Sequence, residues 1–167
     1  LYDRIIYMGE EFTPESCNLI VTQLLYLNNL SNDPIDIYIN SSGGSVIDGL
    51  SIIDTINLIK SPVNTICTGL AASMGAVLLS CGKKGSRAVL PHSRVMIHQV
   101  SSGMWGTFSD LEIELKQTER CKQDIYKILA ENLNKPYEEI EKLCDRNNWF
   151  IGQEAVDLGI VDKVLCK

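Results

Sequence analysis

The sequence predicts an α/β fold in which strand–helix units repeat around a parallel sheet. Up to about residue 100, short apolar runs alternate with segments whose apolar residues have helical spacing. Residues 61–82 carry no charge, but their polar residues and three glycines argue against a membrane span. The chain has 167 residues, of which 45% are hydrophobic, enough for a substantial core. We therefore expect a single domain, 1–167, with no membrane segment.

The first two units have clear boundaries. Residues 4–8 form an apolar strand, and Thr13 with Pro14 provides the N-cap and first turn of a helix. Asp33-Pro34 ends this helix, because proline cannot continue it. Apolar and polar residues then alternate over 35–39, which predicts a half-buried strand.

The third unit contains the most distinctive turn. The strand over 35–39 runs into the glycine pair Gly43-Gly44, and a helix is expected from about 46 to 60. A strand over 63–68 leads to a small-residue turn at Ser73, and a buried apolar helix follows. This arrangement predicts that the Ser73 hydroxyl is exposed where a strand meets a helix.

The last third of the chain is dominated by one long helix. Ser109-Asp110-Leu111-Glu112 has the pattern of a capping box, and helical spacing continues to Asn134. A helix of this length either covers its own sheet as a lid or docks against a neighbouring subunit, and the second interpretation fits better. A short helix after Pro136, another ending at Gly159 and a strand over 160–164 complete the chain. The residues on the shared face of the long helix are Leu111, Leu115, Thr118, Ile125, Ile128, Leu129 and Leu133.

Charge and cysteine usage exclude several classes of function. A net charge of −6, without a basic cluster, argues against a nucleic-acid partner. The six cysteines show no Cys-x-x-Cys spacing and several lie in apolar runs, which favours buried free thiols over disulfides or zinc. The sequence has no His-x-x-x-His pair, paired carboxylates or phosphate loop, so we expect no metal and no cofactor.

Two residues have the chemistry for acyl transfer. Ser73 lies on its turn, and His98 ends an apolar strand 25 residues later. Acyl transfer needs a nucleophile, a base and amides directed at the developing oxyanion. The amide of Met74, at the start of the following helix, and the amide of Gly44 are the candidate donors.

Each of these residues also has a structural interpretation. Ala71 to Gly75 lacks the first glycine of the Gly-x-Ser-x-Gly elbow, and serine often caps a helix for structural reasons alone. A histidine that ends an apolar strand is often only structural, and His92, beside Pro91, fits an exposed loop. Taken singly, these residues leave a catalytic and a structural interpretation open.

Taken together, four ordered groups of residues resemble the Clp protease proteolytic subunits, the ClpP family. The resemblance covers almost the whole chain, in order and with few gaps. The groups are Ile39-Asn40-Ser41-Ser42-Gly43-Gly44; Gly69-Leu70-Ala71-Ala72-Ser73-Met74-Gly75; Leu90-Pro91-His92-Ser93-Arg94-Val95-Met96-Ile97-His98-Gln99; and Glu154-Ala155 with Gly159-Ile160-Val161-Asp162.

The resemblance implies a crotonase-like α/β fold with a protruding handle at about 106–134 for contact between rings. It also implies a homo-oligomer of two stacked heptameric rings, a tetradecamer that encloses a degradation chamber. An AAA+ unfoldase ATPase of the Clp type feeds unfolded polypeptides into such a chamber, and the peptidase itself needs no ATP or metal. The family's axial loops precede the start of this chain. Because the chain begins at Leu1, we expect a removed leader or a fragment.

The resemblance also assigns roles within the site. Ser73 is the nucleophile, His98 is the general base, and the Gly44 and Met74 amides form the oxyanion hole. The family usually has an aspartate as the third member, at the position that Asn147 occupies here. Asn147 can accept a hydrogen bond from His98, but it carries no charge to stabilise the imidazolium. Asp145, two residues earlier, ranks second for this role.

Three functions remain to be compared. The leading hypothesis is a serine endopeptidase subunit of an ATP-dependent protease. The second, motivated by Asn147, is a catalytically impaired structural subunit of a mixed Clp ring, and the third is a crotonase-type acyl-CoA enzyme. The family occurs in bacterial cytoplasm, mitochondria and plastids. A composition rich in asparagine and isoleucine points to an AT-rich genome, which favours a plastid-type organelle over a mitochondrion.

Overall fold

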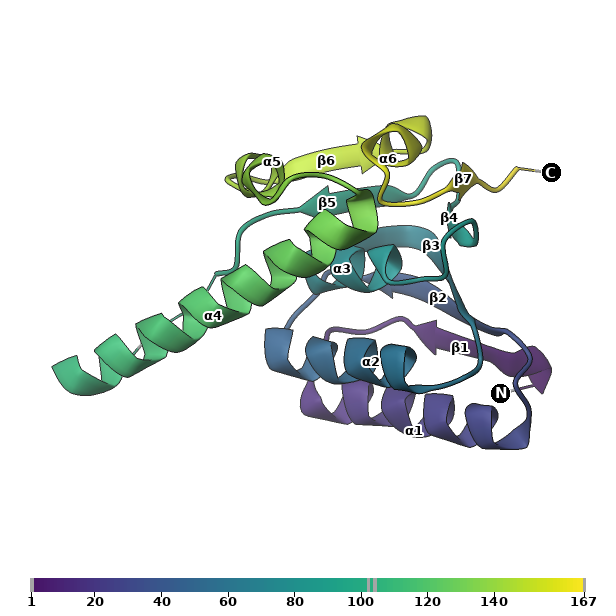
Figure 1. Cartoon of the computed structure of the whole chain (residues 1–167), viewed down its shortest axis with the longest axis horizontal. Helices are drawn as coiled ribbons and strands as arrows, with labels where there is room; N and C mark the ends of the chain where they lie inside the picture. The colour runs from purple at the N-terminus through teal and green to yellow at the C-terminus, as the bar shows by residue number, and fades with distance from the viewer. Residues whose placement is uncertain (1, 102, 104, 167) are drawn as a thin grey trace.

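The computed structural model describes residues 2–101, 103 and 105–166 (Figure 1). Its elements follow the expected alternation of strands and helices over the first hundred residues. In chain order they are η1 (Tyr2–Arg4), β1 (Ile5–Met8), α1 (Pro14–Leu30), β2 (Ile35–Ser41), α2 (Val46–Leu58), β3 (Val63–Ala72), α3 (Met74–Ser80), β4 (Arg87–Val89), β5 (Arg94–Ile97), α4 (Phe108–Leu133), α5 (Tyr137–Leu143), β6 (Asn148–Ile151), α6 (Gln153–Leu158) and β7 (Lys163–Val164).

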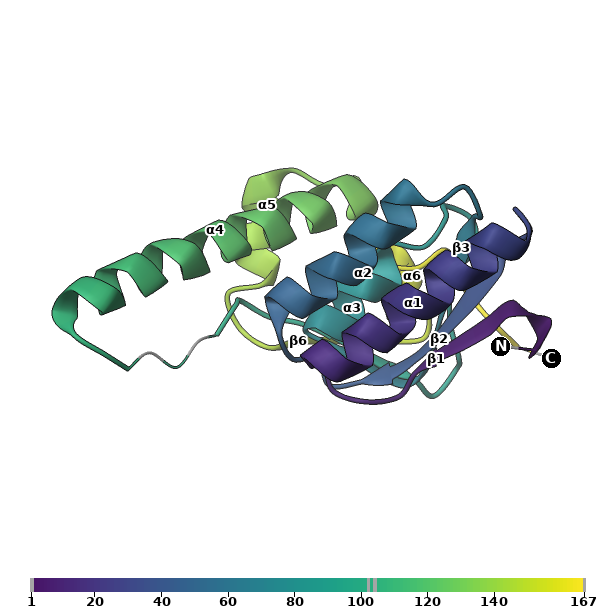
Figure 2. The same ribbon diagram turned by 90° about the horizontal axis from the view of Figure 1, so that it is seen from below.

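The strands form one mixed sheet whose main path is parallel. The order along this path is β1-β2-β3-β4-β7, and β5 pairs in parallel with the end of β3. β6 is antiparallel to β5. Helices α1 and α2 pack against each other, and Figure 2 shows them with α3 on one side of β1 and β2. The parallel α/β architecture predicted from the sequence is confirmed.

The helix after β1 begins as the sequence predicts. Thr13 is its N-cap, and the Thr13 side chain accepts a hydrogen bond from the Ser16 amide at 3.3 Å. The Ser16 hydroxyl in turn accepts one from the Thr13 amide at 3.0 Å, which completes a capping box. Pro14 occupies the first turn, where its missing N–H costs nothing.

Helix α4 begins earlier than the expected cap at Ser109. Thr107 is the N-cap, and its hydroxyl accepts a hydrogen bond from the Asp110 amide at 3.4 Å. Two capping patterns overlap here by two residues, and the upstream one is used. Asn134, with φ of 54°, ends the helix in the left-handed conformation.

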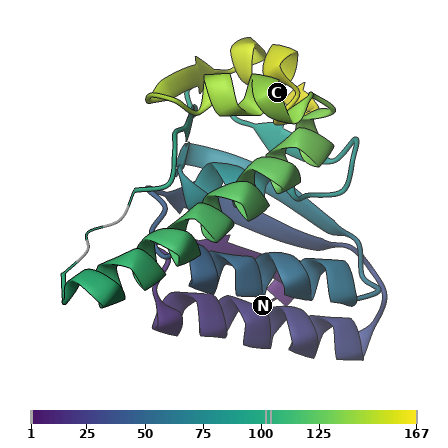
Figure 3. The ribbon, with the colours of Figure 1, turned by 60° about the vertical axis from the view of Figure 1, so that its left-hand side comes forward.

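The two halves of α4 have different surroundings. In the half nearer its C-terminus Cys121, Ile125, Leu129 and Leu133 are buried. In the other half Phe108, Ile113 and Leu115 are 76%, 64% and 60% exposed. Figures 1 and 3 show this first half projecting away from the rest of the chain. A lid on its own sheet would bury these side chains, so the lid interpretation fails for the projecting half.

Some strand boundaries differ from the sequence prediction. β3 extends to Ala72 because its last three residues pair with β5, after its earlier residues have paired with β2 and β4. The expected strand over 160–164 shortens to β7, because Asp162 turns toward Arg87. β6 was not predicted from the sequence.

A buried ion pair joins β4 to the segment before β7. Arg87 is only 3% exposed, and its Nη2 and Nε donate to the Asp162 carboxylate at 2.7 and 3.0 Å. These hydrogen bonds hold the pKa of Asp162 at about 2, below the usual range for a carboxyl group. Arg87 Nη1 also donates to the Asn132 carbonyl at 2.9 Å, which ties the buried end of α4 to the sheet.

The six cysteines are free thiols. Four are buried and Cys166 is exposed. Burial raises the pKa of Cys67 to about 12 and that of Cys144 to about 11, because a thiolate there would be desolvated. Among the helices of the described residues, none combines the length and the apolar character needed to cross a bilayer.

Candidate active site

Ser73 lies between β3 and α3 in a strained backbone conformation. Its φ and ψ are 55° and −122°, a region that residues with a side chain rarely adopt. The turn is held from both sides, since the Ser73 amide donates to the Met96 carbonyl at 2.9 Å and the Ser73 carbonyl accepts from Ala76 at 3.0 Å. Ser73 is half-buried at this sharp turn. This is the geometry of a nucleophile on a strand–turn–helix element.

The glycine pair lies directly beside this turn. A side chain at Gly43 is excluded, because a Cβ there would lie 2.7 Å from the Ser73 Cβ and 3.0 Å from the Met74 nitrogen. Gly43 and Gly44 have φ values of 97° and 143°, which favour glycine. The two glycines therefore allow the backbone at 43–44 to approach Ser73 closely.

Two amides are available where an oxyanion would form. The Gly43 carbonyl accepts from the Phe12 amide at 2.8 Å, and the Ser45 amide donates to the Phe12 carbonyl at 2.9 Å. Gly44 forms an isolated parallel bridge with Phe12, and the two hydrogen bonds of this bridge use the Gly43 carbonyl and the Ser45 amide rather than the Gly44 amide. Met74 is the first residue of α3, and an amide in the first turn of a helix has no acceptor within it. Gly44 and Met74 line the same pocket as Ser73 and His98.

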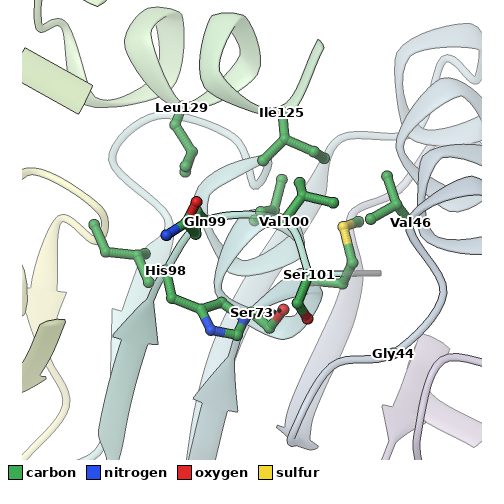
Figure 4. Close-up of a pocket in the computed structure, with 12 residues that line it drawn as sticks. Gly44, Val46, Ser73, His98, Gln99, Val100, Ser101, Ile125 and Leu129 are labelled. Atoms are coloured by element: carbon green, nitrogen blue, oxygen red, sulfur yellow. Dashed lines mark hydrogen bonds between the residues drawn. The ribbon is translucent and has the colours of Figure 1, made fainter. Parts of the chain in front are cut away.

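His98 lies within hydrogen-bonding distance of Ser73. The His98 Nε2 is 2.9 Å from the Ser73 Oγ, and the side chains meet at the mouth of the pocket in Figure 4. On the other side of the imidazole ring, Nδ1 is 3.2 Å from the Asn147 Oδ1. With the proton on Nδ1, His98 donates to Asn147 and accepts from the Ser73 hydroxyl. The structure thus brings Ser73, His98 and Asn147 into one continuous chain of contacts.

The register of the sheet explains how Asn147 reaches His98. Strands β5 and β6 are antiparallel, and Ile97 is paired with Asn148. One step further in the same register places His98 opposite Asn147. Antiparallel neighbours at this step lie close enough for their side chains to touch.

Asp145 forms no hydrogen bond or ion pair with the His98 ring, whose partners are Ser73 and Asn147. Its side chain is 73% exposed, and its carboxylate lies 3.7 Å from the Arg146 Nε. Its backbone carbonyl accepts a hydrogen bond from the Gln99 side chain at 2.9 Å. His92 is exposed, as the loop interpretation predicts. Within residues 2–101, 103 and 105–166, His, Cys, Asp and Glu form no group of three or more that could hold a metal ion.

The pocket beside Ser73 is small, and both polar and apolar residues line it. Its volume is about 50 Å³, and Figure 4 shows Ile125 and Leu129 of α4 above it, across from Val46. These α4 residues were not predicted to belong to the site, because their helical spacing indicates only a buried face. The apolar lining consists of Val46, Met74, Val77, Ile97, Val100, Ile125 and Leu129.

A serine on a strained strand–helix turn, a histidine just beyond the end of the neighbouring strand and two nearby amides form the kind of arrangement that α/β serine hydrolases use. The Clp protease family model matches residues 1–167. Three curated relatives carry the name ATP-dependent Clp protease proteolytic subunit, one of them as subunit 1. That of Porphyromonas gingivalis is 49% identical over 170 residues, covering 100% of this chain and 76% of the relative. That of Salinibacter ruber is 45% identical over 166 residues (99% and 71%), and that of Bacteroides fragilis is 46% identical over 170 residues (100% and 81%).

The chain belongs to the Clp protease family. The resemblance and the fold class inferred from the sequence are therefore confirmed, and so is the function of a serine-type peptidase subunit. The comparisons do not favour the impaired subunit or the acyl-CoA enzyme. These relatives are bacterial, and the preference for a plastid stays a prediction.

Proposed function

We propose that this chain cleaves peptide bonds through Ser73, His98 and Asn147. The observation that carries the proposal is the 2.9 Å contact between the His98 Nε2 and the Ser73 Oγ on the strained turn. His98 removes the hydroxyl proton as Ser73 Oγ attacks the peptide carbonyl, and the same proton then passes to the leaving amine. Water repeats the sequence on the acyl-enzyme, which releases the acid and restores Ser73.

The Gly44 and Met74 amides stabilise the oxyanion of each tetrahedral intermediate. Both amides flank the bend occupied by Ser73, and Gly43 permits this approach because it has no side chain. The pocket under Ile125 and Leu129 then receives a side chain of the substrate next to the bond that is cleaved.

The role of Asn147 is to orient His98 without stabilising its charge. A neutral amide can hold the imidazole ring, but an imidazolium gains less from it than from a carboxylate. We expect Asn147→Asp to raise kcat for a short peptide by about 10–100-fold with little change in KM, on the Coulomb scale for a partly exposed pair. Asn147→Ala is the matched variant that removes the orienting atom and should lower kcat. An unchanged kcat in both variants would remove Asn147 from the mechanism, whereas a rise of several orders of magnitude in Asn147→Asp would support the impaired-subunit alternative.

Covalent labelling tests the nucleophile directly. The assembled protein is treated with a fluorophosphonate probe, and the modified residue is mapped by mass spectrometry. We expect labelling at Ser73, and its loss in Ser73→Ala. Ser101 lines the same pocket, so Ser101→Ala is the matched control and should label as the parent does. Labelling elsewhere, or none in assembled protein, would contradict the assignment.

The projecting half of α4 supports an oligomeric assembly. Phe108, Ile113 and Leu115 expose large apolar side chains on the part of α4 that extends from the domain. We propose that the region 106–134 is the handle through which two heptameric rings of this chain contact each other. Enclosure within such a tetradecamer restricts the site to unfolded polypeptides.

The name of the relatives, ATP-dependent Clp protease proteolytic subunit, supports an AAA+ unfoldase of the Clp type as the partner that supplies substrate. On this proposal the compartment is the bacterial cytoplasm or the interior of an organelle. Co-sedimentation of the assembled chain with such an ATPase, with and without ATP, tests the partnership.

A further inference from the structure

We propose that Gln99 is a positioning residue that holds the Asn147 loop against His98. The Gln99 Nε2 donates to the Asp145 carbonyl at 2.9 Å, which links the residue after His98 to the loop two residues before Asn147. The inference rests on the proposed function, because it concerns the orientation of the proposed general base. Gln99 does not touch the reacting atoms, and it acts through Asn147.

The His98–Asn147 contact lies beyond the end of a short ladder. The last pair between β5 and β6 is Ile97 with Asn148, so His98 and Asn147 lack further strand pairing to hold them. The bond from Gln99 to Asp145 lies on the far side of this contact. The 3.2 Å contact between His98 and Asn147 is therefore enclosed between the ladder on one side and the Gln99 bond on the other.

The hydrogen bonds from Asp145 and from the Asn148 side chain to other residues are longer. The Asp145 amide donates to the Lys142 carbonyl at 3.4 Å, and the Asn148 side chain donates to the Leu143 carbonyl at 3.4 Å. Both reach back toward α5 and neither reaches the strand that carries His98. The Asp145 and Arg146 side chains are 73% and 89% exposed, so packing contributes little. The Gln99 bond is thus a direct tie between the loop and the segment of the general base.

The neutral character of Asn147 makes such a tie important. An aspartate would be drawn to the histidine by charge as the imidazolium forms, and this attraction would tolerate small displacements of the loop. A hydrogen bond between neutral groups weakens steeply with distance and angle. With Asn147 in this position, the surrounding backbone must fix the distance and angle of the His98–Asn147 hydrogen bond. Gln99 helps to fix them on the side of this contact that the strand pairing does not reach.

The test replaces Gln99 by a side chain of similar length that cannot donate. We expect Gln99→Met to lower kcat for a short peptide about tenfold while KM changes less than twofold, because the loss falls on the transition state. Gln153 provides a matched control: its Nε2 donates to the Asp157 carboxylate at the same distance of 2.9 Å, at an exposed site on α6. Gln153→Met should leave kcat unchanged.

A double-mutant cycle separates positioning from general stability. If Gln99 acts through Asn147, then Gln99→Met should have no further effect on kcat in the Asn147→Ala background. A structural role would give the same tenfold fall in both backgrounds, and that result would overturn the proposal. So would an unchanged kcat in the single variant.

Hydrogen exchange provides a readout that does not need activity. In the assembled protein, Gln99→Met should speed amide exchange in residues 144–148, and Gln153→Met should not. Unchanged exchange in Gln99→Met overturns the inference even if the parent is an active peptidase. If Gln99→Met speeds exchange but the parent neither cleaves peptides nor labels at Ser73, the proposed function is refuted while the hydrogen bond from Gln99 still holds the loop.

Discussion

The strain at Ser73 can be measured, because the chain contains a second turn of the same shape. Gly152 joins β6 to α6 with φ and ψ of 49° and −113°, close to the 55° and −122° of Ser73 between β3 and α3. A glycine adopts this conformation freely, whereas a residue with a Cβ does not. We predict that Ser73→Gly is more stable than Ser73→Ala, and that Gly152→Ala is less stable than the parent.

The magnitude follows from two opposing terms. Holding a residue with a Cβ in such a conformation costs about 1–3 kcal/mol. Glycine loses more chain entropy on folding than alanine, a difference of about 0.4–1 kcal/mol. The net difference is about 0–2.5 kcal/mol in favour of glycine at each turn. Space does not confound the Gly152 variant, because a Cβ there would lie 3.6 Å from the Pro91 carbonyl oxygen, an ordinary contact.

Denaturant unfolding at one fixed protein concentration measures both differences, since subunit association would otherwise shift the midpoint. Ser73→Gly and Ser73→Ala both lack the hydroxyl, so their comparison isolates the backbone. The reasoning is refuted if Ser73→Gly is the less stable of the two by about 1 kcal/mol, as in an unstrained turn, while Gly152→Ala is neutral.

Three further predictions concern the ion pair, the exposed arm and the buried thiols. Asp162→Asn leaves the buried Arg87 guanidinium without its partner and should lower the free energy of unfolding by about 3 kcal/mol, measured in urea. Because the pKa of Asp162 is lowered to about 2, this stabilisation is present above the usual carboxyl pKa and should be lost as pH falls from about 4 toward 2. Leu115→Glu should weaken self-association in analytical ultracentrifugation without unfolding the subunit, because Leu115 is exposed in the monomer. Iodoacetamide at pH 8 should modify the exposed Cys166 within minutes and spare Cys67, whose pKa is raised to about 12; rapid modification of Cys67 in folded protein would contradict its burial.

Local patterns predicted most of the fold. The capping residues of α1, the alternation along β2 and the break at Pro34 act over a few residues, and the structure reproduces each of them. The start of α4 was missed because two capping patterns overlap there, and short-range chemistry does not separate them. β6 was missed because its burial alternates weakly and its exposed face carries Trp149 and Ile151, which resemble core residues in sequence.

The site was only partly predictable for a related reason. Ser73 and His98 follow recognisable strands, so their environments can be predicted from neighbouring residues. Asn147 has no local signal, because its position depends on antiparallel pairing with a strand about 50 residues earlier. Asn147 could be predicted only from its place in the family pattern. Ile125 and Leu129 also have no local signal for the pocket, because they line it only through the long-range packing of α4.

The exposure of Asn147 determines how far the missing carboxylate lowers turnover. In trypsin, asparagine in place of the triad aspartate lowers turnover about 10⁴-fold, because the histidine is then held in the wrong tautomer. Here, in the part of the chain that the structure describes, the Asn147 Nδ2 has no protein acceptor that would fix the amide in one orientation. With the oxygen toward His98 the ring donates from Nδ1 and accepts from Ser73, whereas a flipped amide reverses both bonds. The two arrangements make equal numbers of hydrogen bonds, so the productive one is well populated, and the tautomer reduces turnover only a few-fold.

The larger effect on turnover comes from the lost charge of the carboxylate. Its attraction to the imidazolium is worth between about 1 kcal/mol in water and about 4 kcal/mol at a protein surface for a pair 4 Å apart. An exposed pair lies toward the lower end, which is why a gain of about 10–100-fold, rather than 10⁴, is expected from Asn147→Asp.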